Sequence, residues 1–252
     1  MRPANQLVHS RARVRQRYAL LPLEGFPDSR LPTWPDALVK VLAAPALGAQ
    51  FVQYLIELPA AARGSFPADE WLETFYFVIA GTGKFSDGSG IEQALKPGSF
   101  GLTPPQRATN ITSASALRLL ILRKKYEPAK GIDLFKGIYG NQADVAKNVW
   151  ADNPHSLLQT LIPDEFAFDM AMNIFTFDSG FGLPVVETHV MEHGLYFLEG
   201  KGMYYLGEDW MEVETNDFIW MGPYCPQSFY ATGSTPSRYI YYKNINREIG
   251  IQ

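Results

Sequence analysis

The sequence predicts a mostly β protein built from two similar antiparallel barrels in tandem. Aromatic residues make up 13% of the 252 residues, with 13 Tyr and 16 Phe, and such residues favour strands. The 21 Gly and 18 Pro place turns between short apolar runs, the spacing expected of a β-sandwich or barrel. A shift of 119 residues superposes the two halves, since Gly81 falls on Gly200 and Pro104 on Pro223. This internal repeat indicates two related domains.

In the first half, residues 1–45 are expected to form an extension, with modest helical character at 37–43. Residues 46–126 form the first predicted barrel. It begins with an apolar strand at 51–58. An aromatic strand follows and ends at the turn Gly81-Thr82-Gly83. A turn at Pro97-Gly98 and a closing strand at 117–123 complete the pattern.

In the second half, residues 127–164 are expected to connect the domains, with a short helix or turn at 141–150. Residues 165–252 form the second predicted barrel, which repeats the same signals. A strand at 168–177 is followed by an aromatic strand ending at Gly200-Lys201-Gly202. The closing strand is expected at 238–243.

Composition excludes several classes of function. The net charge of −4 gives no sign of a nucleic-acid or anionic-membrane partner, and no apolar run is long enough to span a bilayer. The single cysteine, Cys225, rules out an intrachain disulfide and fits a reducing compartment. We therefore expect a cytoplasmic protein that acts on a small molecule. We also expect a homo-oligomer, of a size that the sequence does not give.

The candidate site lies in the run 182–193, which holds two of the four histidines. On a strand, Glu187 and His189 would point to the same face, and His193 could curl back toward them. One carboxylate and two imidazoles around one point suit a divalent transition metal. The alternative is a surface loop with scattered polar residues. The apolar and aromatic neighbours argue against it, because a buried charge needs a partner or a metal.

The last predicted strand carries a second group of candidates. Tyr239, Tyr241 and Lys243 alternate along it and therefore share one face. If that face is inward, Lys243 could pair with a substrate carboxylate or pass a proton to a departing amine. Otherwise it is a solvated lysine at a strand end. Tyr241 is expected to be a core residue. Tyr204, just after a glycine turn, is a candidate for lining the same cavity.

These residues carry a family resemblance. The spacing of Glu187, His189, His193 and Gly200 resembles the first motif of the cupin superfamily. The usual order is altered, because Glu187 stands where a His is expected and His193 where a Glu is expected. Gln227 stands where cupins present their last ligand. This altered set resembles the (S)-ureidoglycine aminohydrolases, as do the runs HGLYFLEGKG at 193–202, DFIWMGPYCPQ at 217–227 and SRYIYYKNINR at 237–247.

The resemblance implies two tandem cupin barrels, each a jelly roll of the double-stranded β-helix type. It implies an enzyme of purine (allantoin) catabolism that releases ammonia from (S)-ureidoglycine to give (S)-ureidoglycolate. One Mn²⁺ per chain would be held in the C-terminal barrel by Glu187, His189, His193 and Gln227. Glu187 and Lys243 would be catalytic, and Glu187, Gln227, Tyr239 and Lys243 would contact the substrate.

The first half has no matching donors. The repeat places Ala68, Glu70, Thr74 and Ala108 opposite the four ligands, and one carboxylate among these cannot hold a transition metal. Two other functions remain open: an iron-dependent dioxygenase and a ligand-binding cupin without catalysis. Gln227 argues against the first, because it fills a position that oxygen chemistry leaves open. An intact ligand set and an inward Lys243 argue against the second.

Overall fold

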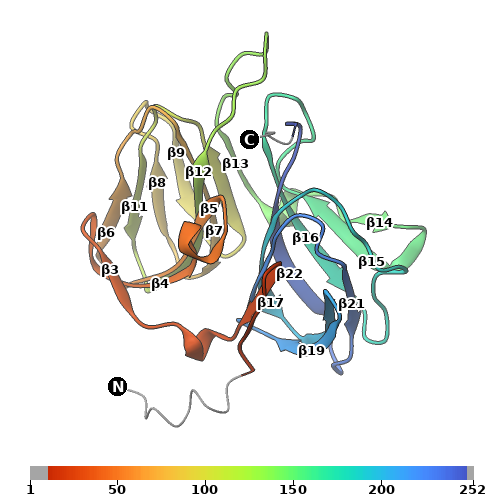
Figure 1. The fold of residues 1–252 in the computed structure, drawn as a ribbon. Helices are drawn as coiled ribbons and strands as arrows, with labels where there is room; N and C mark the ends of the chain where they lie inside the picture. Colours follow the sequence, from red (N-terminus) through yellow and green to blue (C-terminus); the bar gives the residue numbers. More distant parts are fainter. Residues whose placement is uncertain (1–10, 249–252) are drawn as a thin grey trace. The chain divides into compact units, whose positions relative to one another are not determined.

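The structure is a computed structural model that describes residues 11–248, and it divides into two compact units (Figure 1). The N-terminal barrel comprises residues 27–145 and 162–169. The C-terminal barrel comprises residues 11–26, 146–161 and 170–248. The first ten residues of the expected extension lie outside the described part. Between residues 11 and 248, no helix has the length and apolar character needed to cross a membrane.

The N-terminal barrel consists of two antiparallel sheets with an apolar core between them. The larger sheet has the order β13-β10-β7-β12-β5-β4-β3 and the smaller one β6-β11-β8-β9. Trp34 and Tyr76 from the larger sheet pack with Phe66, Phe85 and Ile111 from the smaller one. The strands are β3 (Ser29–Leu31), β4 (Trp34–Ala43), β5 (Phe51–Leu58), β6 (Arg63–Phe66), β7 (Leu72–Ala80), β8 (Gly83–Ser86), β9 (Glu92–Leu95), β10 (Ser99–Thr103), β11 (Thr109–Ser113), β12 (Leu117–Lys125) and β13 (Ile138–Asn141).

The C-terminal barrel repeats this plan. Its larger sheet has the order β1-β2-β20-β17-β22-β16-β15-β14 and its smaller sheet β19-β18-β21. The core between them is rich in aromatic residues, among them Phe177, Phe197 and Phe229. The strands are β1 (Arg13–Val14), β2 (Tyr18–Leu21), β14 (Asn148–Trp150), β15 (Asn153–Thr160), β16 (Met170–Phe177), β17 (His193–Glu199), β18 (Lys201–Leu206), β19 (Asp209–Glu214), β20 (Phe218–Met221), β21 (Gln227–Ala231) and β22 (Ser237–Asn244).

The predicted repeat is visible in the strand order. The run β5-β12-β7-β10 of one barrel corresponds to β16-β22-β17-β20 of the other. The two predicted glycine turns also correspond, since Gly81 and Gly200 have φ values of +87° and +81°. A Cβ atom on Gly200 would lie 2.6 Å from the carbonyl oxygen of Pro236. Both the backbone angle and the close approach therefore require glycine at this turn. The mostly β fold with two barrels is confirmed.

The expected extension and connection are distributed between the barrels. Residues 13–21 add β1 and β2 to the C-terminal barrel, while β3 and β4 belong to the N-terminal barrel. The range 37–43, expected to be helical, lies in β4, where Val39 pairs with Ile56 of β5. Pairing with a neighbouring strand outweighs a weak local helix preference. The range 127–164 contributes β13 to one barrel and β14 and β15 to the other, together with a 3₁₀ turn at Gln142–Asp144. Two further 3₁₀ turns are Leu23–Gly25 and Pro45–Leu47.

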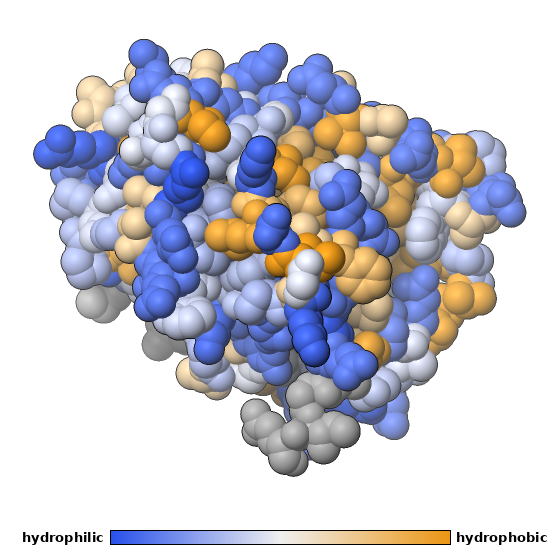
Figure 2. Space-filling view, turned by 90° about the horizontal axis from the view of Figure 1, so that it is seen from above, coloured by the Kyte–Doolittle hydropathy of each residue, from blue (hydrophilic) through white to orange (hydrophobic). Residues whose placement is uncertain are grey.

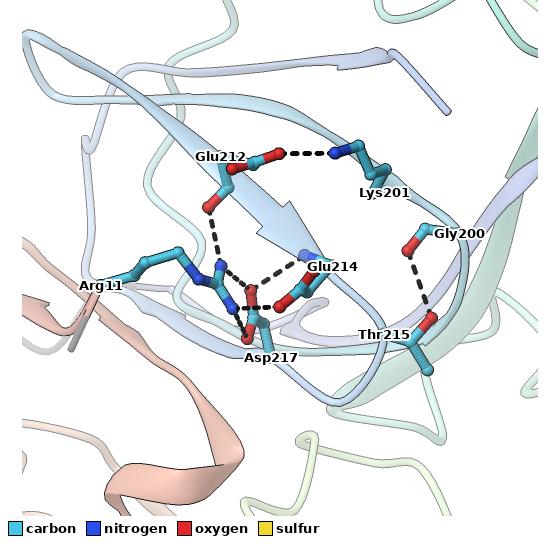
Figure 3. A network of polar contacts seen from close by, with 7 residues as sticks. All are labelled: Arg11, Gly200, Lys201, Glu212, Glu214, Thr215 and Asp217. Atoms are coloured by element: carbon cyan, nitrogen blue, oxygen red, sulfur yellow. Dashed lines mark hydrogen bonds and ion pairs between the residues drawn. The ribbon is translucent and has the colours of Figure 1, made fainter. Parts of the chain in front are cut away.

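An arginine clasp holds the N-terminal arm, residues 11–21, on the C-terminal barrel (Figure 3). The Arg11 guanidinium donates two parallel hydrogen bonds to Asp217, with Nη1–Oδ2 at 2.6 Å and Nη2–Oδ1 at 2.9 Å. It also bonds the Glu214 carboxylate at 2.8 Å. The Asp217 side chain is only 2% exposed. A paired, two-point bond to a buried carboxylate is stronger than an ordinary surface contact. The clasp therefore fixes the arm, whose strand β2 pairs with β20.

The structure changes one part of the repeat alignment. The sequence offset places Lys124 opposite Lys243, but the strand register does not. Lys243 pairs with His193 in the C-terminal barrel, whereas Arg123 pairs with Thr74 at the corresponding place in the N-terminal barrel. The irregularities lie at equivalent places, skipping Ile79 in β7 and Leu198 in β17, but β22 pairs one residue further along than the repeat offset gives. A one-residue shift turns a side chain to the other face of a sheet. Arg123 is therefore the structural counterpart of Lys243.

Candidate active site

A cavity of about 350 Å³ opens within the C-terminal barrel. It brings together all seven site residues predicted from the sequence, although these come from four separate parts of the chain. The lining residues are Trp150, Phe175, Leu183, Glu187, Thr188, His189, His193, Leu195, Tyr204, Gln227, Tyr239, Tyr241 and Lys243. Polar groups therefore converge at one place in a wall that is otherwise aromatic and aliphatic, which is the usual character of a small-molecule site.

Glu187 and His189 lie on a loop, not on the strand that the sequence predicted. The segment between β16 and β17 makes only two isolated bridges to β21, at Gly182–Tyr230 and Glu187–Gln227. The backbones of Glu187 and Gln227 exchange two hydrogen bonds, of 2.8 and 2.9 Å. The corresponding segment of the N-terminal barrel is the regular strand β6. His193 begins β17, so the site combines a loop pinned to one sheet with a rigid strand of the other.

The two histidines are held in their neutral form. Burial, then the neighbouring His189 and Lys243, lower the pKa of His193 well below its usual value. Burial, then Lys243, also lower the pKa of His189. The ring centroids are 4.8 Å apart, and the Nδ1 atom of each ring is buried without a hydrogen-bond partner among residues 11–248. Neutral imidazoles close together have lone pairs available for a metal ion.

Gln227 links the histidines to the tyrosines. Its Nε2 atom is 3.0 Å from Nε2 of His189, and its Oε1 atom accepts a hydrogen bond of 3.2 Å from Tyr204. The ring of Tyr239 packs beside that of Tyr204, with centroids 6.2 Å apart. Burial raises the pKa of both phenols, so both keep their protons. The result is a hydrogen-bonded row from Tyr204 through Gln227 to His189 along the cavity wall.

Glu187 and Lys243 supply the opposite charges of the site. Both are half-buried and line the cavity. Burial raises the pKa of Glu187, and the positive charge of Lys243 opposes this shift. Lys243 lies directly across from His193 on the neighbouring strand. Tyr239, Tyr241 and Lys243 all line the cavity, as expected if the face that they share is inward.

Sequence reasoning missed the apolar wall. Trp150, Phe175, Leu183, Thr188 and Leu195 line the cavity but carry no pattern that separates them from core residues. Trp150 comes from the expected connection and packs edge-on against Phe175, with ring centroids 5.5 Å apart. Tyr241, expected to be a core residue, belongs both to the core cluster and to the cavity wall. The pairing of strands from distant parts of the chain brings these residues to the cavity.

The donor chemistry of the cavity fits a divalent metal ion. The buried Nδ1 atoms without partners and the neutral state of both rings support this fit. A carboxylate, two imidazoles and an amide oxygen are all groups that such ions accept. In the part of the chain that the structure describes, however, no three His, Cys, Asp or Glu side chains are already gathered into a metal cluster. The residues thus share one cavity without forming a closed cage.

The corresponding end of the N-terminal barrel has different contents. Arg123 donates a hydrogen bond of 3.3 Å to Thr74, and its guanidinium lies 4.3 Å above the ring of Phe66. An arginine bound to a hydroxyl and an aromatic ring replaces the imidazole and lysine of the other barrel. This arrangement offers a cation where a metal site needs donors.

Solved structures of other proteins share this fold. A protein of Pseudomonas aeruginosa described as glyoxylate-induced is 32% identical, with a TM-score of 0.89, over 100% of this chain and 96% of that one. Ylba of E. coli is 30% identical, with a TM-score of 0.84, over 99% and 100% of the two chains. A cupin barrel protein of Leptotrichia buccalis has a TM-score of 0.62 at 14% identity and covers 90% of this chain. Two such barrels in one chain define a bicupin.

Sequence comparison with curated proteins narrows this class. The (S)-ureidoglycine aminohydrolase of Escherichia coli (strain K12) is 32% identical over 251 residues, 97% of this chain and 95% of that protein. The Arabidopsis thaliana enzyme of the same name is 30% identical over 94% of this chain and 79% of its own length. The chain belongs to the (S)-ureidoglycine aminohydrolase family of enzymes, which confirms the resemblance seen in the sequence. No protein-family model matches the chain.

Proposed function

We propose that this chain releases ammonia from (S)-ureidoglycine and forms (S)-ureidoglycolate. The observation that carries the proposal is the convergence of Glu187, His189, His193, Gln227 and Lys243 on one cavity of the C-terminal barrel. Family relatives are named for this activity. In the reaction, water supplies a hydroxyl group to the α-carbon, and the C–N bond to the amine breaks.

The proposed metal is a single Mn²⁺ ion, held by Glu187, His189, His193 and Gln227. Support comes from the two neutral imidazoles with unpartnered nitrogen atoms and from the carboxylate and amide in the same cavity. Such an ion supplies Lewis acidity and a fixed orientation for a small substrate with two donor groups. The residues at the corresponding positions of the N-terminal barrel do not offer this set of metal donors, so we propose one ion per chain.

The protein groups around it have separate tasks. Lys243 places a positive charge opposite His193, where it can pair with the substrate carboxylate or give a proton to the departing amine. Tyr239 and Tyr204 bring hydroxyl groups to the same wall, and Glu187 brings the negative charge. The apolar residues around them exclude water from the cavity. Polar contacts are stronger where water is excluded. Lys243→Arg separates the two lysine roles, because arginine keeps the charge but does not give up a proton.

The direct test is ammonia release from freshly generated ureidoglycine by the purified, Mn²⁺-loaded chain. We expect ammonia above the spontaneous rate, one enantiomer of ureidoglycolate as product, and the same rate under nitrogen as in air. An iron dioxygenase would lose activity without oxygen. A binding protein without catalysis would leave the spontaneous rate unchanged.

We also propose a cytoplasmic homo-oligomer. On the face drawn in Figure 2, hydrophobic residues lie among hydrophilic ones. Val185 and Val186, in the ligand-bearing loop, are 59% and 52% exposed, and Tyr224, whose N–H bonds the carbonyl of His189, is 53% exposed. Exposed apolar residues grouped beside a site are typical of surfaces that are buried in a protein–protein interface. Light scattering on the purified chain measures the mass of the assembly, and a monomer would contradict this proposal.

A further inference from the structure

Asn173 and Tyr241 form a polar pair inside the C-terminal barrel that the roles above leave unexplained. They face each other in register on β16 and β22, and Nδ2 of Asn173 donates a hydrogen bond of 3.2 Å to the Tyr241 hydroxyl. Asn173 is 4% exposed, and its Oδ1 atom has no hydrogen-bond partner within residues 11–248. Burying an amide among aromatic residues costs free energy unless its hydrogen bonds are made. An amide with only one of its two polar atoms hydrogen-bonded therefore needs an explanation.

The ring of Tyr241 is fixed by its neighbours. It is stacked with Phe175, with centroids 5.6 Å apart and planes 10° from parallel. It is also stacked with His193, at 5.8 Å and 24°. With the ring held by packing and the oxygen held by Asn173, the hydroxyl group has one fixed place in the cavity wall. A pre-positioned group of this kind binds a ligand with little further loss of entropy.

The hydrogen of the Tyr241 hydroxyl is available to a ligand. A phenol has one hydrogen to donate and two lone pairs to accept, and Asn173 occupies one lone pair. The described residues provide no hydrogen-bond acceptor for the phenol hydrogen. A phenol keeps this hydrogen at neutral pH without any special environment. Tyr241 lines the cavity together with Glu187 and Lys243.

We propose that Tyr241 is a further substrate-binding residue, whose hydroxyl donates to the ureido carbonyl oxygen of the substrate, and that Asn173 positions it. The inference rests on the proposed function. Tyr241 and Lys243 are two residues apart on one strand, so they reach two different groups of a small substrate. The ammonium group suits the carboxylate, and the neutral donor suits the neutral carbonyl. Tyr241 would thus distinguish ureido-bearing substrates from simple α-substituted acids.

The test uses a ligand that keeps the ureido group and carboxylate but lacks the amine, namely ureidoacetate, and compares it with glycolate. Tyr241→Phe keeps the ring and deletes only the hydroxyl. In the Mn²⁺-loaded protein, calorimetry should show ureidoacetate binding weakened about tenfold, the factor equivalent to about 1.4 kcal/mol, with glycolate binding unchanged. The value of kcat/KM for ureidoglycine should fall by a similar factor, and the melting temperature should fall modestly, because the buried Asn173 amide loses its partner. Tyr205→Phe, in β18 of the smaller sheet and on the face opposite Tyr204, is the control and should match the unsubstituted chain.

A double-mutant cycle tests the positioning role of Asn173. Asn173→Ala should weaken ureidoacetate binding in the unsubstituted chain but add nothing to Tyr241→Phe, because it acts only through that hydroxyl. Additive effects would overturn the positioning role, and Tyr241→Phe alone decides the binding role if Asn173→Ala does not fold. If the unsubstituted chain is active but Tyr241→Phe binds ureidoacetate as tightly as it does, the inference is overturned while the proposed function stands. An inactive unsubstituted chain would overturn both the proposed function and the inference.

Discussion

At the scale of single residues, the face of the sheet decides what a lysine does. Lys243 and Lys124 occupy the same place in the sequence repeat, and Lys243 lines the cavity of the C-terminal barrel. Lys124 turns the other way and is buried between Glu73, at 3.4 Å, and Asp169. Alternation along β22 was enough to predict that Tyr239 and Lys243 share a face. It was not enough to place Lys124, because the register in which the closing strand pairs with its neighbour differs by one residue between the barrels.

The first prediction concerns Lys243. Lys243→Met keeps most of the side chain and removes the charge. We expect kcat/KM for ureidoglycine to fall at least about tenfold, since a hydrogen bond to a charged group contributes about 1.5–3 kcal/mol. Metal content and melting temperature should stay nearly unchanged, because the residue is half-buried and forms no ion pair with another residue between 11 and 248. Lys84→Met, an exposed lysine of β8, is the control. Normal turnover in Lys243→Met would remove this residue from the site.

The second prediction concerns the pH dependence of the buried cluster around Lys124. Burial, then the neighbouring Asp169, raise the pKa of Glu73 well above its usual 4.5. Because the folded-state pKa is raised, the stability linked to this carboxyl is complete below about pH 4.5. It is lost as pH rises toward the folded-state pKa. Glu73→Gln cannot ionise, so its melting temperature relative to the unsubstituted chain should increase from pH 4 to pH 7. A difference independent of pH would contradict this prediction.

Lys124 provides the complementary variant. Lys124→Met leaves the Asp169 carboxylate, which is 1% exposed, without its cation. Removing one partner of a buried ion pair typically costs about 3–5 kcal/mol, so thermal unfolding should begin at a much lower temperature. The sequence repeat alone would suggest Lys124→Met as the control for Lys243→Met. It is unsuitable, because it would itself destabilise the fold.

At the scale of elements, strands from distant parts of the chain complete each barrel. The arm strand β2 extends the larger sheet beside β20, which in turn pairs with β17, the strand that begins at His193. The arm also bonds the turn beside the ligand loop: Gly222 donates to the carbonyl of Arg17, and Tyr224 donates to the carbonyl of His189. Short-range patterns predicted the hairpins within each half. They could not predict this pairing, because β2 and β20 lie some two hundred residues apart.

The third prediction concerns the clasp of Figure 3. Arg11→Ala leaves the buried Asp217 carboxylate without its two-point donor. An unsatisfied buried acceptor costs about 1–3 kcal/mol, and more when it is charged. We expect a lower melting temperature and faster amide exchange in β1 and β2. Arg15→Ala is the matched control, since that side chain donates an exposed hydrogen bond to the carbonyl of the neighbouring Val14. Equal stability of the two variants would show that strand pairing alone holds the arm.

At the scale of the whole molecule, two barrels share one topology and differ in what they contain. The sequence repeat and its glycine turns predicted the shared topology, since Gly81 and Gly200 adopt the same conformation. Sequence also identified Glu187, His189 and His193 as residue types suited to a metal. Gln227 stood out only through the family resemblance, because a glutamine has no distinctive spacing. Trp150 and Asn173 could not be found, because their roles depend on which strand lies beside them.

The central claim is that one metal site, in the C-terminal barrel, carries out ureidoglycine deamination. It is tested most directly by adding Mn²⁺ stepwise to the metal-stripped chain and measuring ammonia release from ureidoglycine. We expect the rate to rise and level off at about one equivalent per chain, because only the C-terminal barrel has the donors for a metal ion. The Glu187→Ala, His189→Ala double variant should stay at the spontaneous rate throughout. Saturation at two equivalents, or equal activation of the double variant, would contradict the account.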